Sequence, residues 1–325
     1  MFDIEELYVV ENNIGWKFEE TSNPFSTVDY SSDGTLVAFS NRPGEVNVVS
    51  SYDGSIRHQF TLTATQFPIA GVNFYRTDEN LLLTCCRDGY IFLHNIMKGD
   101  IVNQTRHLGS NVMCSAVDNF NETFAIACQD GSIRLYSVET FQRSMALVKM
   151  SSRISSNTNV FSLVYDTDDS NILLSAHPND RVLIWDLRTG NSEREINGPH
   201  LRGNGLDIYD NNILTVSSRQ NKQIELWDFG TAQKIKDIQF DTQSAGGECT
   251  LVCGKCAKNG LDLVVGGGNV NIAQAFNYTN GLYMGQTDVF PSPVSNLAIS
   301  PFGASFVVGT EKGAVSCYMV RVRQV

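Results

Sequence analysis

Long apolar runs are absent from the chain: no stretch approaches the roughly 20 consecutive apolar residues that a membrane-spanning helix needs. Basic residues are also scarce, because 24 Lys and Arg stand against 35 Asp and Glu, and the net charge is −11. Phosphate contacts need an excess of positive charge, so this balance argues against nonspecific binding to DNA or RNA. We therefore expect a protein that neither inserts into a membrane nor binds nucleic acid.

The chain also lacks the basic start of a secretory signal, because residues 1–6 (MFDIEE) are acidic. We expect a cytoplasmic protein, and the cytoskeleton, the cilium and the nucleus remain compatible locations. In such a reducing compartment the eight cysteines are expected to be free thiols.

A sustained helical periodicity is missing too, which excludes architectures that alternate strands and helices. A short strand pattern recurs instead. Residues 181–187 (RVLIWDL) and 223–229 (QIELWDF) align, and their tryptophans, Trp185 and Trp227, are 42 residues apart. The same position is occupied more weakly elsewhere, at intervals of 42 to 49 residues, by Val49, His94, Tyr136, Ala273 and Tyr318.

Each period divides into four short strands separated by turn residues. In the second period, the strands are 69–75, 81–86, 90–96 and about 101–106, with the turn Arg87-Asp88-Gly89 between the second and third. Four antiparallel strands in each of seven repeats predict one domain, an all-β, seven-bladed propeller. The expected blades span approximately 25–60, 69–106, 112–147, 160–196, 203–238, 249–287 and 294–325.

A propeller must join its last blade to its first, because open sheet edges would otherwise be exposed. The N-terminal region supplies a spare strand, in which Ile14, Trp16 and Phe18 alternate with polar or small residues. We expect residues 14–20 to form the outer strand of the last blade and to pair antiparallel with 314–322. We therefore expect residues 1–20 to provide a lead-in and closing strand; the alternative is a frayed acidic tail.

The run Leu183-Ile184-Trp185-Asp186-Leu187-Arg188-Thr189-Gly190 resembles the WD-repeat family, and the resemblance covers about residues 25–320. The Gly-His pair of the family is missing. The resemblance implies that His107 and His200 lie near the position of the family's structural histidine, and that His107 and Asp130 form a buried network that braces a blade. It implies structural roles for Trp16, Trp185, Asp186, Trp227 and Asp228.

Catalytic and metal-binding patterns are weak. Cys249, Cys253 and Cys256 suggest a zinc or redox site, but no fourth ligand follows at a suitable spacing, so we interpret them as core residues. The run Gly266-Gly267-Gly268 precedes a strand and not a helix, so it is interpreted as a turn. We therefore predict no enzyme activity, no catalytic residues, no metal and no cofactor.

In a propeller, the loops that join strands two to three and four to one share one face, which we call the top face. Nine basic residues and seven acidic residues fall there; the basic ones are Arg42, Arg87, Lys149, Arg153, Arg181, Arg202, Arg219, Lys222 and Lys312. The opposite face is acidic, with eight acids (Asp33, Asp78, Glu79, Glu122, Asp166, Asp168, Asp169 and Asp210) against Arg76 and Lys258.

The top face is expected to bind an acidic segment of a partner protein, because Arg pairs with carboxylates through two bonds. The predicted contact residues are Arg42, Phe67, Arg87, Arg181, His200, Arg202 and Arg219. The equally weighted alternative is that these arginines are solvated loop residues.

The leading functional hypothesis is a non-catalytic scaffold or adaptor that binds other proteins as a subunit of a larger complex. Residues 185–188 (WDLR) also resemble the motif of propellers that are substrate receptors of cullin-RING ubiquitin ligases, in which Arg188 would pair with an adaptor carboxylate. In the simpler interpretation, Arg188 is a solvated turn residue. A third hypothesis is a structural component of a cytoskeletal or ciliary assembly.

Overall fold

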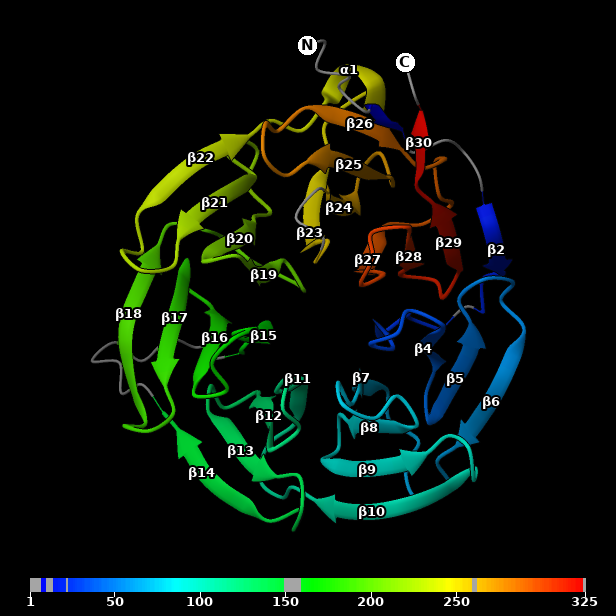
Figure 1. Ribbon diagram of the computed structural model, residues 1–325, viewed down its shortest axis with the longest axis vertical. Coiled ribbons are helices and arrows are strands. Elements are labelled where there is room, and N and C mark those ends of the chain that lie inside the picture. The colour runs from blue at the N-terminus through cyan, green and yellow to red at the C-terminus, as the bar shows by residue number, and fades with distance from the viewer. Residues whose placement is uncertain (1–6, 10–13, 22, 149–158, 259–261, 324–325) are drawn as a thin grey trace, which may run out of the picture.

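The computed structural model describes residues 7–9, 14–21, 23–148, 159–258 and 262–323. Within these residues, seven four-stranded antiparallel sheets form a ring, viewed along its axis in Figure 1. The predicted all-β, seven-bladed propeller is confirmed. In the described part of the chain, no helix is long and apolar enough to cross a membrane.

Each blade takes four strands, and the first three blades follow one another along the chain. The first contains β3 (Thr27–Tyr30), β4 (Leu36–Arg42), β5 (Glu45–Ser50) and β6 (Ile56–Thr61). The second contains β7 (Ile69–Phe74), β8 (Leu81–Cys86), β9 (Tyr90–Asn95) and β10 (Asp100–Arg106). The third contains β11 (Val112–Val117), β12 (Thr123–Cys128), β13 (Ile133–Ser137) and β14 (Arg143–Leu147).

The next three blades repeat the order. The fourth contains β15 (Ser162–Tyr165), β16 (Ile172–His177), β17 (Arg181–Asp186) and β18 (Asn191–Asn197). The fifth contains β19 (Leu206–Tyr209), β20 (Asn212–Val216), β21 (Ile224–Asp228) and β22 (Lys234–Ile238), and the short helix α1 (Thr242–Ala245) follows it. The sixth contains β23 (Thr250–Cys256), β24 (Asp262–Gly268), β25 (Ala273–Asn277) and β26 (Tyr283–Gln286).

The seventh blade is built from both ends of the chain. Three of its strands, β27 (Val294–Ile299), β28 (Ser305–Thr310) and β29 (Val315–Met319), are consecutive, and the fourth is β2 (Ile14–Phe18). In Figure 1 the blue β2 lies beside the red β29. The two strands pair antiparallel, with Phe18 opposite Val315 and Ile14 opposite Tyr318, so the predicted closure by an N-terminal strand is confirmed. A second pair, β1 (Leu7–Val9) with β30 (Arg321–Arg323), continues beyond the blade.

The hydrophobic core lies between the blades. Seven clusters of buried side chains each combine residues of two neighbouring blades, and together they cover all seven blade-to-blade interfaces. For example, Phe60 of the first blade and Phe74 of the second belong to one cluster. Strand residues that point to either face of a blade therefore meet an adjacent sheet, which explains the nearly continuous burial of the middle strands.

Polar groups near the central channel add links from blade to blade. Asp29 of β3 accepts a hydrogen bond from the Phe74 amide of the next blade at 2.9 Å. In the same way, Asp207 of β19 accepts a bond from the Cys256 amide at 2.9 Å. Each carboxylate therefore links the inner strands of two neighbouring blades, because it accepts from a backbone N–H that is not used within its own sheet.

Trp16 fixes the closing strand against the first blade. Its side chain is 7% exposed, and its indole N–H donates to the Ser51 carbonyl at 2.9 Å. Gly54 has a φ of +68° and lies directly under the indole ring, because a Cβ at this position would be 2.7 Å from Trp16 Cγ. Trp16 therefore contacts the blade that follows the closure.

Replacement of Trp16 by Ala should destabilise the whole ring. We expect the free energy of unfolding to fall by about 3–5 kcal/mol, because a buried indole and its hydrogen bond are lost at the closure. Urea or thermal unfolding measures the change. Ile14→Ala in the same strand is the control, since Ile14 is 43% exposed and should cost less than about 1 kcal/mol. Equal effects of the two variants would contradict this role of Trp16.

Candidate protein-binding surface

The repeated aromatic position is braced by a hydroxyl group of the neighbouring strand. The indole N–H of Trp185 donates to Ser175 Oγ at 2.7 Å, and that of Trp227 donates to Thr215 Oγ1 at 2.9 Å. In the second blade, His94 takes the position of the tryptophan and its Nε2 lies 2.9 Å from Thr84 Oγ1. These side chains hold two strands of their own blade together.

His94 should make stability depend on pH. The ring is fully buried, and this burial lowers the pKa of His94 from 6.5 to about 4. The unfolded chain therefore binds a proton between pH 6.5 and 4 that the folded chain rejects, so stability is complete above pH 6.5 and falls as the pH decreases. We expect a loss of about 2–3 kcal/mol between pH 7 and pH 4.5 from this group.

Urea unfolding at a series of pH values tests this dependence. His94→Gln keeps a hydrogen-bonding side chain beside Thr84 and cannot titrate, so its stability profile should be flatter over the same interval. A profile that is as steep in the variant as in the parent would show that other groups are responsible.

The aspartates of the two Trp-Asp pairs fix the turn that follows each strand. Asp186 accepts hydrogen bonds from the Arg188 amide at 2.9 Å and from its guanidinium at 2.7 Å and 3.0 Å. The Arg188 side chain and amide hold the pKa of Asp186 at about 2. Asp228 accepts from the amide and hydroxyl of Thr231. Arg188 is thus closed onto its own turn.

The expected His107–Asp130 pair is replaced by other contacts. His107 Nδ1 lies 3.2 Å from the hydroxyl of Tyr136, which occupies the tryptophan position of that blade. Asp130 pairs instead with the guanidinium of Arg134 at 2.7 Å and accepts from Ser132 at 2.6 Å. The phenol of Tyr136 reaches the histidine, and Arg134 satisfies the carboxylate, so the predicted network divides into two separate contacts.

Backbone hydrogen bonds bring the two classes of top-face loop together. The Arg87 amide donates to the Pro68 carbonyl at 3.0 Å, the Ser218 amide to His200 at 2.9 Å, and the Glu311 amide to Pro293 at 2.8 Å. In each case a turn between strands two and three contacts a loop that joins two blades. The top face is therefore a continuous surface of both kinds of loop.

Three of the five arginines among the predicted contact residues already pair with carboxylates of their own blade. Arg42 lies 3.8 Å from Glu45, Arg181 lies 2.6 Å from Glu195, and Arg219 lies 2.6 Å from Glu225. Glu225 is 2% exposed, so its charge needs this compensation. These arginines have an internal structural partner, which reduces what each one offers to another protein.

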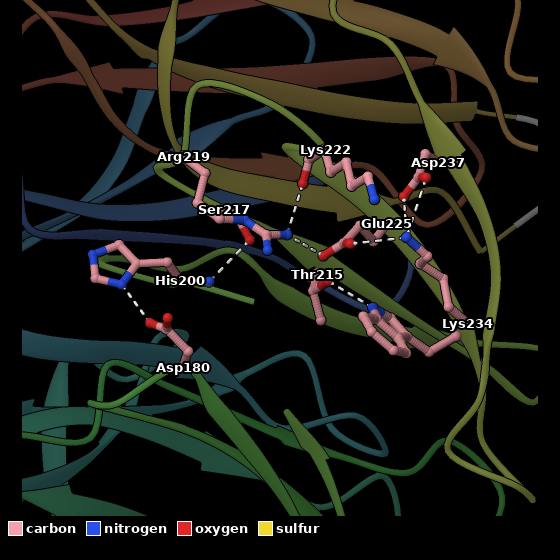
Figure 2. Close-up of polar contacts among 10 residues, drawn as sticks. Asp180, His200, Thr215, Ser217, Arg219, Lys222, Glu225, Lys234 and Asp237 are labelled. Atoms are coloured by element: carbon pink, nitrogen blue, oxygen red, sulfur yellow. Dashed lines mark hydrogen bonds and ion pairs between the residues drawn. The ribbon is translucent and has the colours of Figure 1, made fainter. Parts of the chain in front are cut away.

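Figure 2 shows how the paired groups extend across the fourth and fifth blades. Glu225 also lies 3.5 Å from the Lys234 ammonium, which in turn contacts Asp237 at 2.9 Å. On the neighbouring loop, His200 Nδ1 lies 2.5 Å from Asp180, and the His200 amide donates to Ser217 at 3.1 Å. Arg202 Nε contacts the other ring nitrogen of His200 at 2.9 Å. His200 therefore links three loop segments.

Arg219 and Arg87 should respond differently to substitution. Arg219→Met leaves the buried Glu225 carboxylate with Lys234 alone, and we expect the free energy of unfolding to fall by about 3 kcal/mol. Arg87→Met should change stability by less than about 0.5 kcal/mol, because Arg87 is exposed. Chemical unfolding of both variants measures the difference. Equal stabilities of the two variants would contradict the conclusion that Arg219 has a structural role and that Arg87 does not.

Arg87 lies in a turn whose backbone is hydrogen-bonded to two loops that carry exposed apolar side chains. Its amide is bonded to Pro68, next to Phe67, while the Gly89 carbonyl accepts from the His107 amide, next to Leu108. Phe67 is 55% exposed and Leu108 is 73% exposed. We call Phe67, Arg87 and Leu108 the blade-two patch. Phe67 and Arg87 were predicted from the sequence as contact residues, whereas Leu108 was not, although its position in a loop between blades was a signal.

Among the described residues, neither Arg87 nor Arg202 forms an ion pair with a carboxylate. The Arg87 guanidinium contacts Met113 Sδ at 4.0 Å. Lys149 and Arg153, which were also assigned to the top face, lie outside the described residues. Of the predicted contact residues, Arg87 and Arg202 are therefore the two arginines without a carboxylate partner among the described residues.

The cysteines have the environment of core residues. Burial raises the pKa of all eight thiols, for instance to about 12 for Cys249 and to about 11 for Cys128. They are therefore protonated near neutral pH, which makes them poor nucleophiles and metal ligands. Within the residues that the structure describes, no group of three or more His, Cys, Asp or Glu is arranged to hold a metal ion.

The fold defines the chain as a β-propeller. No protein-family model matches the chain. The chain is similar to Cilia- and flagella-associated protein 52 of Chlamydomonas reinhardtii, with 30% identity over 119 residues. The match covers 36% of this chain and 18% of that protein, so it spans less than a fifth of the length of the relative.

Proposed function

We propose that the chain is a WD-repeat propeller that acts as a non-catalytic scaffold in a ciliary or other cytoskeletal assembly and binds a partner protein through the blade-two patch. The single observation that carries the binding proposal is that Arg87, which has no carboxylate partner among the described residues, lies in a turn bonded to the loops that carry the exposed side chains of Phe67 and Leu108. The other components of the proposal rest on the fold, the repeat pattern and the relative.

The chemistry of the patch selects the partner. An arginine flanked by exposed apolar side chains is suited to a segment in which an acidic residue lies between apolar ones. The guanidinium would pair with the carboxylate, and Phe67 and Leu108 would cover apolar side chains on either side. The same loops are tied to their neighbours by backbone bonds, so the patch is held in place before binding and little ordering is needed.

The assignment to a cilium rests on the similarity to a protein that is named for its association with cilia and flagella. A propeller suits such an assembly because its strands form a stiff ring and its loops present separate surfaces. The resemblance to WD repeats is supported by the two Trp-Asp pairs, in which each tryptophan bonds a hydroxyl of the second strand and each aspartate fixes a turn.

The ubiquitin-ligase hypothesis receives less support from the geometry. It requires Arg188 to offer its guanidinium to an adaptor, whereas this side chain is bonded to both carboxylate oxygens of Asp186. An adaptor carboxylate would have to compete with that contact. We therefore favour the ciliary scaffold.

A double charge substitution tests the surface and the location together. The tagged chain is expressed in ciliated cells, and the fraction retained in the detergent-extracted cytoskeleton is measured. We expect the parent to be retained, and Phe67→Glu with Leu108→Glu to weaken binding by about 30-fold or more, as for the loss of a central contact. Unchanged unfolding curves would show that both forms of the chain fold.

Met97→Glu is the matched control, because Met97 is 74% exposed but belongs to the turn between β9 and β10, away from the top face. It should be retained like the parent. Retention of the double variant would overturn the role of the patch. Loss of the parent chain from the extracted cytoskeleton would overturn the ciliary and cytoskeletal assignment.

A further inference from the structure

The central channel contains a cavity of about 380 Å³ that is lined by residues of all seven blades. This volume is within the range of about 300–1,000 Å³ that is typical of pockets for small molecules. The cavity is independent of the blade-two patch, whose three residues do not line it. Its walls are the inner strands, so they are held by every blade-to-blade interface.

The charge of the lining is opposite to that of the protein. The chain carries a net charge of −11, but the charged side chains that line the cavity are four cations and two carboxylates: Arg76, Arg202, Lys255, Lys258, Asp29 and Asp207. Arg76 and Lys258 are the two basic residues that the sequence analysis assigned to the acidic face. The structure places both at the channel.

The two carboxylates are already engaged. Asp29 accepts from the Phe74 amide and pairs with Arg76 at 3.2 Å. Asp207 accepts from the Cys256 amide, and its other oxygen lies 3.9 Å from the Lys255 ammonium. Each carboxylate therefore already accepts a hydrogen bond from a backbone amide and lies close to one cation.

Lys258 is a third cation of the lining. No carboxylate of the described residues lies within ion-pair distance of its ammonium group. Lys258 is exposed to solvent and lies near Arg76, Lys255, Asp29 and Asp207. Arg76, Lys255 and Lys258 all line the cavity, where these three cations outnumber the carboxylates of Asp29 and Asp207.

The surroundings favour a small anion over a polymer. The turns around this end of the channel carry the eight acids of the face opposite the top face. These acids repel an extended polyanion such as a nucleic acid or an anionic membrane. A compact anion can enter past them and reach the cations. A phosphate group suits a site with three cations better than a carboxylate group does, because a phosphate carries up to two charges and accepts several charge-assisted hydrogen bonds.

We propose that the channel end formed by Arg76, Lys255 and Lys258 is a binding site for a small phosphorylated molecule. This site is separate from the protein-binding surface. Arg76 and Lys255 are fixed by their aspartates and by bonds to backbone carbonyls, at 3.2 Å from Arg76 to Tyr30 and at 2.9 Å from Lys255 to Leu206. Lys258 supplies a positive charge with which no carboxylate of the described residues forms an ion pair.

Isothermal titration of the full chain with pyrophosphate tests the site, with ionic strength held constant by sodium chloride. We expect saturable binding of one pyrophosphate per chain, and a melting temperature that rises with its concentration. Lys258→Glu should weaken binding at least tenfold. Sulfate at the same concentration is the comparison for a divalent anion without a phosphate group, and it should bind more weakly.

Lys98→Glu is the matched control, because it makes the same charge change at an exposed residue that does not line the cavity. It should bind pyrophosphate like the parent. Absence of saturable binding would overturn the proposal, and so would equal affinity of the parent and Lys258→Glu or equal affinity for pyrophosphate and sulfate. The melting temperatures without ligand establish that both variants fold.

Discussion

The contact between neighbouring blades is the constraint on which the rest of the structure depends. Each buried cluster belongs to two sheets, so a single blade would expose a large apolar face to water. The cluster between the seventh and first blades forms only when the ring is closed, and it contains Trp16 of the strand that the other end of the chain supplies. Stability is consequently a property of the circle and not of any one repeat.

The same contact determines which side chains remain for recognition. Some charged groups serve to hold the ring together and are not available to a partner. Asp29 and Asp207 each link the inner strands of two blades, and Glu225 is paired with Arg219 inside its own blade. Surface charge therefore has to be counted after these internal pairs are removed. What remains is unevenly distributed, with Arg87 among apolar loop residues on one face and Lys258 at the channel on the other.

Much of the architecture was predictable because it follows from spacing. The interval between Trp185 and Trp227, extended along the chain, predicted the number of blades, and the alternation around Trp16 predicted the closing strand. Side-chain pairing was harder, because it depends on residues that are brought together across strands. The phenol of Tyr136 displaced the expected partner of His107, and the buried Glu225 beneath Arg219 has no local sequence signal.

The pairing of β1 with β30 has a consequence for how the propeller can be connected to other sequence. It places residue 7 opposite residue 323, although the chain has travelled around the full circle between them. A polypeptide that enters and leaves at one point can be joined to further sequence on both sides without opening the ring. The propeller can therefore be inserted into a loop of another domain without any change in the order of its blades.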